Sequence, residues 1–154
     1  MKMKIDLLNR LSEFYKDNPE MKGVPLTLND INQVETTLQI KLPDDYKLFV
    51  STYGGSYAGL AIYGLKNAEM MGDETVIDLT NRARKLLDEL KVNNYILKSI
   101  VISDDGAGNP IFINEKGEVY IYYVDNDEYE KLGDSLGEVI EETFMSGDYL
   151  NIRK

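Results

Sequence analysis

The stretch LQIKLPDDYKLFVSTYGG, residues 38–55, predicts where one helix ends and the next begins. Pro43 suits the first position of the second helix, because its missing N–H would have no partner there. Asp44 and Asp45 fall in the first turn, where the helix dipole favours negative charge. A buried stripe at helical spacing follows, formed by Tyr46, Phe49, Val50 and Tyr53. Gly54 or Gly55 then supplies the left-handed residue that ends the helix.

Helical patterns also precede this stretch. Residues 3–17 place apolar side chains at helical spacing and predict an amphipathic N-terminal helix within residues 1–20. Thr27 and Asp30 have the spacing of a capping box. One apolar face follows them, formed by Ile31, Val34 and Leu38.

Two more helices are predicted downstream. Residues 72–91 form the clearest helical pattern in the chain, and we expect Asp73 to cap it. A closing helix is predicted from Ser135, with Glu138 completing a capping box and Gly147 ending the helix.

Strand patterns fill most of the remaining sequence. LAIYGL (residues 60–65) predicts one strand, and KSIVIS, PIFIN and EVYIYYV predict an antiparallel meander between the last two helices. Helices come first, strands later, and a helix closes the chain. This order predicts an α+β fold with a mainly antiparallel sheet and helices packed around it. We expect a single domain over residues 1–154.

Cysteine and histidine are absent from all 154 residues. Their absence excludes a disulfide framework, a thiolate or imidazole metal site, a Cys nucleophile and a Ser-His-Asp triad. Acid–base catalysis would have to use Asp, Glu, Lys or Tyr, and no two carboxylates stand out as an acid/base couple. The charged start is unlike a signal peptide, and no run of about 18 apolar residues exists. We therefore expect a cytoplasmic protein without metal, cofactor or membrane association.

The net charge of −10 is concentrated in one region. Residues 104–148 hold 13 acids and only two bases, Lys116 and Lys131, whereas residues 1–103 are nearly neutral. Such acidity disfavours nucleic acid as a ligand, because binding phosphates requires Lys and Arg. It would attract a basic protein partner. The charge is equally compatible with a role in solubility alone.

The turn SDDGAGNP, residues 103–110, lies between two of the predicted strands. Its glycines are misplaced for an EF-hand calcium loop, and no Lys follows as a phosphate-binding P-loop requires. A hairpin turn needs only positive φ at Gly106 and Gly108 and backbone bonds from Asp104, Asp105 and Asn109. We predict this turn, with an exposed recognition role as a second possibility.

The segment DNDEYE, residues 125–130, follows the last predicted strand. Asp125 and Asp127 resemble the start of a calcium loop, but Glu130 and Leu136 stand where Gly and Glu are required. We therefore predict an acidic surface loop.

Eleven tyrosines either pack in the core and sheet or contribute to a protein interface, where Tyr is enriched. Tyr120 and Tyr122 share one face of their strand and Tyr123 lies on the other, so some of these rings should face solvent or a partner. The candidate partner-binding residues are Asp104, Asp105, Tyr122, Tyr123, Asp125, Asp127 and Glu128.

The run from Ile31 to Gly55 resembles the signature of the SUKH superfamily, which includes Smi/Knr-type cell-wall regulators and many bacterial immunity proteins. IVISDDGAGNPIFIN, GEVY and SLGEVIEETF resemble the later strands and closing helix of that family, so the resemblance covers roughly residues 27–146. Tyr53 departs from the usual Asn, and no His follows the Val-Tyr strand. The positions that match the signature are Ile31, Glu35, Leu42, Pro43, Asp45, Tyr46, Lys47 and Phe49.

The resemblance implies a SUKH-like α+β fold and a non-catalytic protein-binding module. In bacteria such proteins are commonly immunity proteins that neutralise a cognate toxin, often a nuclease, by stoichiometric binding. The partner would then be a basic toxin domain. The alternative is a regulatory scaffold of the Smi/Knr type that binds a signalling or cell-wall partner.

Overall fold

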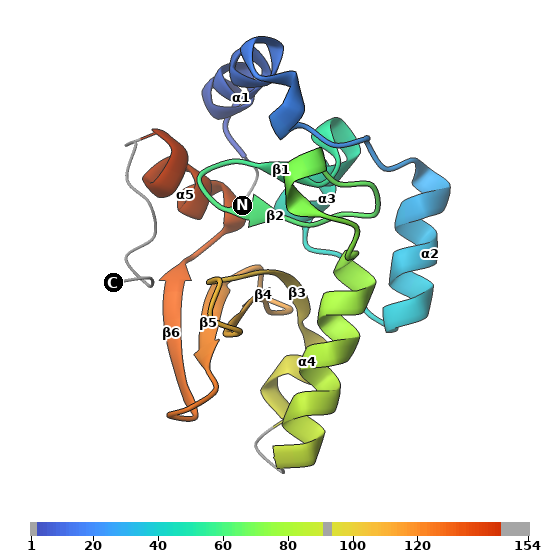
Figure 1. Cartoon of the computed structure of the whole chain (residues 1–154), viewed down its shortest axis with the longest axis vertical. Helices are drawn as coiled ribbons and strands as arrows, with labels where there is room; N and C mark the ends of the chain where they lie inside the picture. The colour runs from blue at the N-terminus through green and yellow to red at the C-terminus, as the bar shows by residue number, and fades with distance from the viewer. Residues whose placement is uncertain (1–2, 91–93, 146–154) are drawn as a thin grey trace.

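The computed structural model describes residues 3–90 and 94–145 and confirms the α+β class (Figure 1). Helix α5 (Leu136–Ile140) continues into a π-helical turn at Glu141–Met145. The helices of this part of the chain are α1 (Ile5–Asp17), α2 (Leu28–Leu38), α3 (Asp44–Tyr53), α4 (Val76–Leu90) and α5 (Leu136–Ile140). The strands are β1 (Ser56–Tyr57), β2 (Ala61–Ile62), β3 (Ile100–Asp104), β4 (Pro110–Ile113), β5 (Val119–Tyr123) and β6 (Glu128–Gly133).

The first three helices begin and end close to the predicted positions. Thr27 and Asp30 form the predicted capping box at the start of α2, with each side chain bonding the backbone N–H of the other. Pro43 immediately precedes α3, and Gly54 ends that helix with a φ of +75°. A side chain in this left-handed region would be strained, which is why glycine stands there.

The cap of α4 differs from the prediction. Helix α4 begins at Val76, and Thr75 rather than Asp73 caps it. The Thr75 hydroxyl accepts the N–H of Asp78 at 3.1 Å, and the Asp78 carboxylate accepts the N–H of Thr75 at 2.9 Å. This reciprocal pair satisfies two N–H groups at once, which a lone Asp73 could not do. Ser135 accepts the N–H of Glu138 as predicted, whereas Gly147 lies outside the described residues.

The predicted meander exists and has one strand more than expected. The sheet order is β3-β4-β5-β6, and every neighbouring pair is antiparallel. The interpretation of residues 125–130 as a surface loop is wrong from Glu128 onward, because Glu128–Gly133 is strand β6 and pairs with β5. The strand predicted over residues 60–65 shortens to β2, which pairs with β1.

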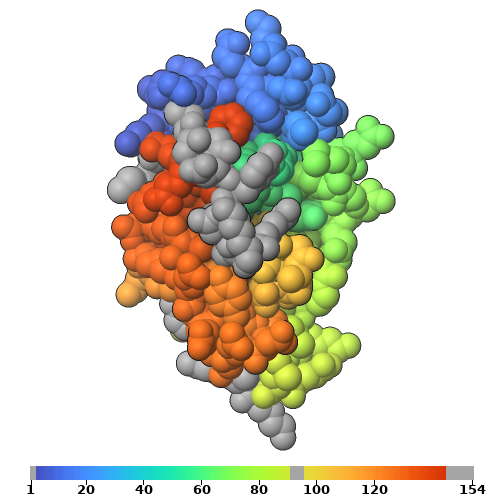
Figure 2. All heavy atoms as spheres, turned by 60° about the vertical axis from the view of Figure 1, so that its left-hand side comes forward, coloured from blue at the N-terminus to red at the C-terminus, as the bar shows by residue number. Residues whose placement is uncertain are grey.

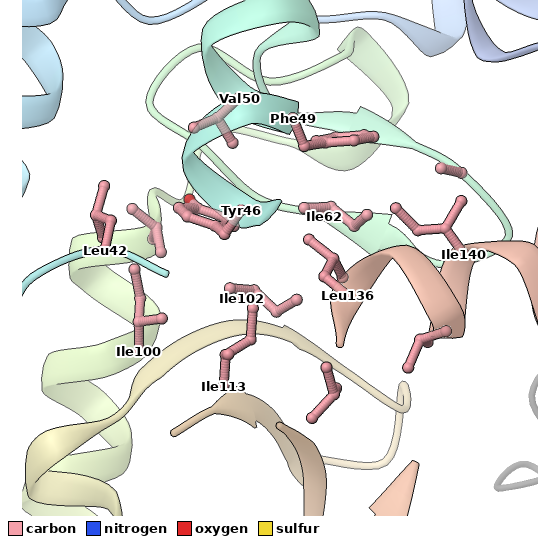
Figure 3. Close-up of a cluster of buried hydrophobic side chains, with 14 of the residues drawn as sticks. Leu42, Tyr46, Phe49, Val50, Ile62, Ile100, Ile102, Ile113, Leu136 and Ile140 are labelled. Carbon is pink, nitrogen blue, oxygen red and sulfur yellow. The ribbon is translucent and has the colours of Figure 1, made fainter. Parts of the chain in front are cut away.

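The larger hydrophobic core lies between one face of the four-stranded sheet and the helices α1, α3 and α5 (Figure 3). Phe49 and Val50 of α3 approach this core from above, and Ile102 and Ile113 approach it from the sheet. All four side chains are almost completely buried. Burying each large apolar side chain contributes roughly 1.5–3 kcal/mol before entropy is counted, so this core dominates the stability of the fold.

The opposite face of the sheet is also covered. Leu79, Ala83 and Leu87 of α4 pack there in a second core, which includes Phe112 and Tyr122 of the sheet. Figure 1 shows α4 running beside the sheet, away from α1 and α5. Both sheet faces are therefore packed, and the alternating tyrosines of β5 do not by themselves create an exposed aromatic face.

Candidate functional site

Two acidic loops meet at one end of the four-stranded sheet. The β3–β4 loop and the β5–β6 turn both follow strands that run toward this end. The Asn109 side-chain oxygen of the first loop accepts the backbone N–H of Val124 in the second at 2.9 Å. We call this region the acidic end and define it by five carboxylates, which belong to Asp104, Asp105, Asp125, Asp127 and Glu128. The two loops contain no base among residues 104–109 and 124–128.

The β3–β4 loop is the predicted hairpin turn. Gly106 and Gly108 have φ values of +85° and +90°, and the Asp104 side chain accepts the N–H of Gly106 at 2.7 Å. Asp105 accepts the N–H groups of Ala107 and Asn109. The prediction for Asn109 is wrong in one respect, because its side-chain oxygen binds the neighbouring β5–β6 turn rather than its own loop.

Asp105 keeps its charge although its side chain is buried. Burial alone would raise its pKa, but hydrogen bonds from the side chain of Asn109 and from backbone N–H groups hold the pKa below its usual value. Asp105 is only 4% exposed, so it fixes the loop and contributes charge from within. The Asp104 side chain, in contrast, is exposed.

The β5–β6 turn directs its acids to solvent. Asp125, Asp127 and Glu128 are exposed, and Asp127 has a φ of +52°, a conformation that Asp tolerates better than most residues. The Tyr122 hydroxyl donates a hydrogen bond to Asp127 at 2.8 Å. Burial, followed by this carboxylate, raises the pKa of Tyr122 to about 12.

The two candidate tyrosines differ in accessibility. Tyr122 is 0% exposed, so the expectation that its ring contacts a partner is wrong: α4 covers this face of β5. Tyr123 lies on the other face, is partly exposed, and donates its hydroxyl proton to Glu130 at 2.8 Å. Burial and then Glu130 raise the pKa of Tyr123 to about 12. Glu130 is therefore a further acid bound to a candidate residue, although the sequence did not mark it as a candidate itself.

The molecular surface shows these segments together. In Figure 2 the orange strands β5 and β6 adjoin the gold segment around the β3–β4 loop on one face. Of the seven predicted residues, the side chains of Asp104, Asp125, Asp127 and Glu128 are exposed and that of Tyr123 is partly exposed, whereas Asp105 and Tyr122 are buried. The structure therefore brings the seven predicted residues together, and five of them are accessible to a partner while two are buried.

Neither metal coordination nor membrane insertion is suggested by the described residues. Across residues 3–90 and 94–145, no three Asp or Glu side chains are grouped so that they could hold a metal ion. No helix within the same ranges is long and apolar enough to cross a membrane.

A separate cleft of about 380 Å³ lies at the opposite end of the sheet. It is bounded by the start of α3, the β4–β5 turn and the start of α5. Its charged lining consists of the three lysines Lys41, Lys47 and Lys116 and the three acids Asp44, Asp45 and Glu115. The two ends of the sheet therefore differ in charge, because only the acidic end lacks bases.

The residues that carry the family resemblance hold the fold together. Glu35 of α2 accepts the N–H of Leu42 at 2.8 Å and so fixes the segment between α2 and α3. Asp45 of α3 accepts the N–H of Gly137 at 3.0 Å and so caps α5, which lies 92 residues further along the chain. The buried Tyr46 donates to the carbonyl of Tyr63 at 2.6 Å.

The glycines of the signature permit a close backbone approach. A Cβ atom on Gly54 would lie 2.1 Å from the carbonyl oxygen of Val24. A Cβ atom on Gly55 would lie 1.9 Å from the side-chain oxygen of Asn67. Real Cβ atoms do not approach other atoms this closely, so both positions require glycine for packing. These residues of the run from Ile31 to Gly55 have structural roles, and the acidic end lies outside that run, in the later part of the span that resembles the family.

Comparison with known proteins agrees with this arrangement. The model of the SMI1 / KNR4 family (SUKH-1) matches residues 25–142, close to the span of the resemblance. No curated protein matches the chain significantly. Since the matched span includes α2, α3, α4, all four strands of the large sheet and α5, the chain belongs to the SMI1/KNR4 family (SUKH-1).

Proposed function

We propose that this protein is a non-catalytic immunity protein that neutralises a cognate toxin by binding it stoichiometrically through the acidic end. Family membership supports the general role, because SUKH proteins include immunity proteins. One observation carries the proposal. The hydrogen bond between Asn109 and Val124 holds two acidic loops together, and neither loop contains a base.

A basic toxin domain is the partner that suits this surface. Four exposed carboxylates, those of Asp104, Asp125, Asp127 and Glu128, would accelerate encounter with a cationic active-site cleft. Once the proteins are in contact, the partly exposed ring of Tyr123 would provide apolar area beside the charges. Binding of this kind occludes the toxin without any chemical step.

The first experiment uses charge reversal with a matched control. The double variant Asp125→Lys/Glu128→Lys reverses the charge of two exposed acids of the acidic end. The control Glu13→Lys/Asp17→Lys makes the same change of charge on α1. Basic proteins captured from source cells at low salt are expressed in a tester strain together with each variant, and growth is measured.

The expected result is that the wild-type chain and the α1 control restore growth, whereas the double variant at the acidic end does not. Association measured with the captured toxin should slow at least tenfold on charge reversal, and the dependence on salt should weaken. If the captured proteins are harmless, or are toxic in the presence of the wild-type chain, the immunity role is refuted. Capture of a signalling or cell-wall protein would instead support the regulatory alternative.

A further inference from the structure

Strand β3 contains a bulge just before the acidic end. Val101 lies opposite Phe112 in the neighbouring strand β4. The next pair joins Ser103 to Ile111, so β3 advances two residues while β4 advances one. Ile102 is therefore the extra residue of a β-bulge. A bulge of this kind changes the side of the sheet on which the following residues project.

The bulge turns Asp104 toward the side of the sheet that α4 covers. Asp104 lies opposite Pro110, and directly opposed residues of two strands project on the same face. Pro110 shares its face with Phe112, which belongs to the second core beneath α4. Strict alternation from Ile102, a residue of the larger core, would instead place Asp104 on the other face. The bulge thus decides on which side this exposed acid stands.

Two segments outside the sheet hold the bulge in place. The Thr80 hydroxyl of α4 accepts the N–H of Val101 at 2.9 Å and donates to the carbonyl of Val101 at 3.4 Å. Thr80 is completely buried, and Figure 1 shows α4 beside β3. In the segment after β2, the N–H of Tyr63 donates to the carbonyl of Ile102 at 2.9 Å. A single side chain of α4 therefore satisfies both backbone groups of the residue that precedes the bulge.

Asp104 consequently stands near an aromatic ring. Tyr63 packs against the second core and is partly exposed. Burial, followed by the charges of Asp104 and Glu74, raises the pKa of Tyr63. Arg82, which is paired with Glu74, acts in the opposite direction and lowers that pKa. The α4 side of the acidic end thus combines an exposed carboxylate with part of a tyrosine ring.

We infer that Thr80 positions Asp104 for contact with the partner by stabilising the bulge in β3. This inference rests on the proposed function and specifies that the α4 side of the acidic end receives basic side chains of the partner. A cationic side chain docked there can pair with the carboxylate of Asp104 and lie against the ring of Tyr63. Because Thr80 is buried, it acts through Asp104 and not by contact with the partner.

A purely structural role for Thr80 is the competing explanation, because a buried hydroxyl that satisfies backbone groups also stabilises the fold. Thr80→Val removes the hydroxyl and keeps the side-chain shape, whereas Thr80→Ser keeps the hydroxyl. Only the positioning role predicts that Thr80→Val moves Asp104 away from Tyr63. Thr143→Val is the matched control, because the buried Thr143 hydroxyl donates to the carbonyl of Val139 at 2.9 Å, outside the sheet.

The first measurement follows the pKa of Tyr63 by NMR in the full-length chain with isotope-labelled tyrosine rings. Asp104→Asn should lower this pKa because a neighbouring charge is lost. Thr80→Val should lower it by a comparable amount, and the double variant should show no further decrease. Thr80→Ser and Thr143→Val should retain the wild-type value. An unchanged pKa in Thr80→Val, or additive decreases in the double variant, would overturn the inference.

The second measurement titrates the same chains with a hexa-arginine peptide at low salt. Asp104→Asn and Thr80→Val should each weaken binding about threefold, and combining them should not weaken it further. Thr80→Ser and Thr143→Val should bind like the wild-type chain. Wild-type binding by Thr80→Val would overturn the inference. Both measurements use the chain without a toxin, whereas growth rescue by the wild-type chain tests the proposed function, so the two can fail separately.

Discussion

Replacing Asp45 by Ala tests whether the joint between α3 and α5 stabilises the domain. The change removes the carboxylate that accepts the N–H of Gly137 at 3.0 Å. Gly137 is buried, and a Cβ placed on it would lie 3.1 Å from the Asp45 carboxylate, so the two residues are closely packed. The N–H of Gly137 would lose its acceptor inside the protein.

The expected loss in free energy of unfolding for Asp45→Ala can be estimated in two ways. A buried N–H without an acceptor costs about 1–3 kcal/mol, and loss of a helix cap typically costs about 1 kcal/mol. Burial raises the pKa of Asp45, which shows that its charged form is disfavoured there, so removal of the charge offsets part of the loss. We expect Asp45→Ala to lower the free energy of unfolding by about 1–2 kcal/mol. Asp45→Asn keeps an acceptor oxygen and should lose less than about 1 kcal/mol.

Equilibrium unfolding in urea measures both variants against the wild-type chain, and an unchanged slope would show that the same surface unfolds. The joint would have no stabilising role if Asp45→Ala fell within about 0.3 kcal/mol of wild type. The reasoning would also fail if Asp45→Asn lost as much as Asp45→Ala, because the acceptor would then be irrelevant.

Three further outcomes are expected. Burial raises the folded-state pKa of Asp45 above its unfolded value of about 3.8. The protonated group therefore contributes fully to stability below that unfolded pKa and loses this contribution as the pH rises through the folded-state pKa. In urea unfolding, the free energy of unfolding of the wild-type chain should increase relative to that of Asp45→Asn as the pH is lowered. Gly54→Ala combines a strained φ with a clash against Val24, and urea unfolding should show a loss of about 3 kcal/mol. Tyr122→Phe should cost about 1 kcal/mol in urea unfolding yet leave growth rescue by the chain unchanged, since its ring is buried; impaired rescue in a folded variant would contradict this.

The helices were predictable because their determinants are local. The capping pair of Thr27 and Asp30, and the sequence around Pro43, specify helix ends within a few residues. The error at α4 was also local: Thr75 and Asp78 have the same capping spacing as Thr27 and Asp30, and that signal outweighs the isolated Asp73.

The remaining differences depend on contacts between distant segments. Strand β6 has too few apolar residues to show a strand period, and pairing with β5 is what holds it in extended form. Whether Tyr122 is exposed depends on where α4 crosses the sheet, which spacing within β5 cannot reveal. The bond between Asp45 and Gly137 spans 92 residues, so only the folded chain reveals this second role of Asp45.

Hydrogen bonds within the acidic end fix the conformation of both of its loops. Asp104 and Asp105 bond the backbone of their own loop, Asn109 ties that loop to Val124, and Asp127 is held by Tyr122. The Asp45 joint lies beside the cleft at the other end of the sheet. Under the proposed function, changes in the two hairpin turns would alter which partner is recognised while the joint between Asp45 and Gly137 stays intact. Under the proposed function, the helices and sheet form a constant scaffold for the two turns. Transplanting both turns together should then transfer partner choice between chains of this fold.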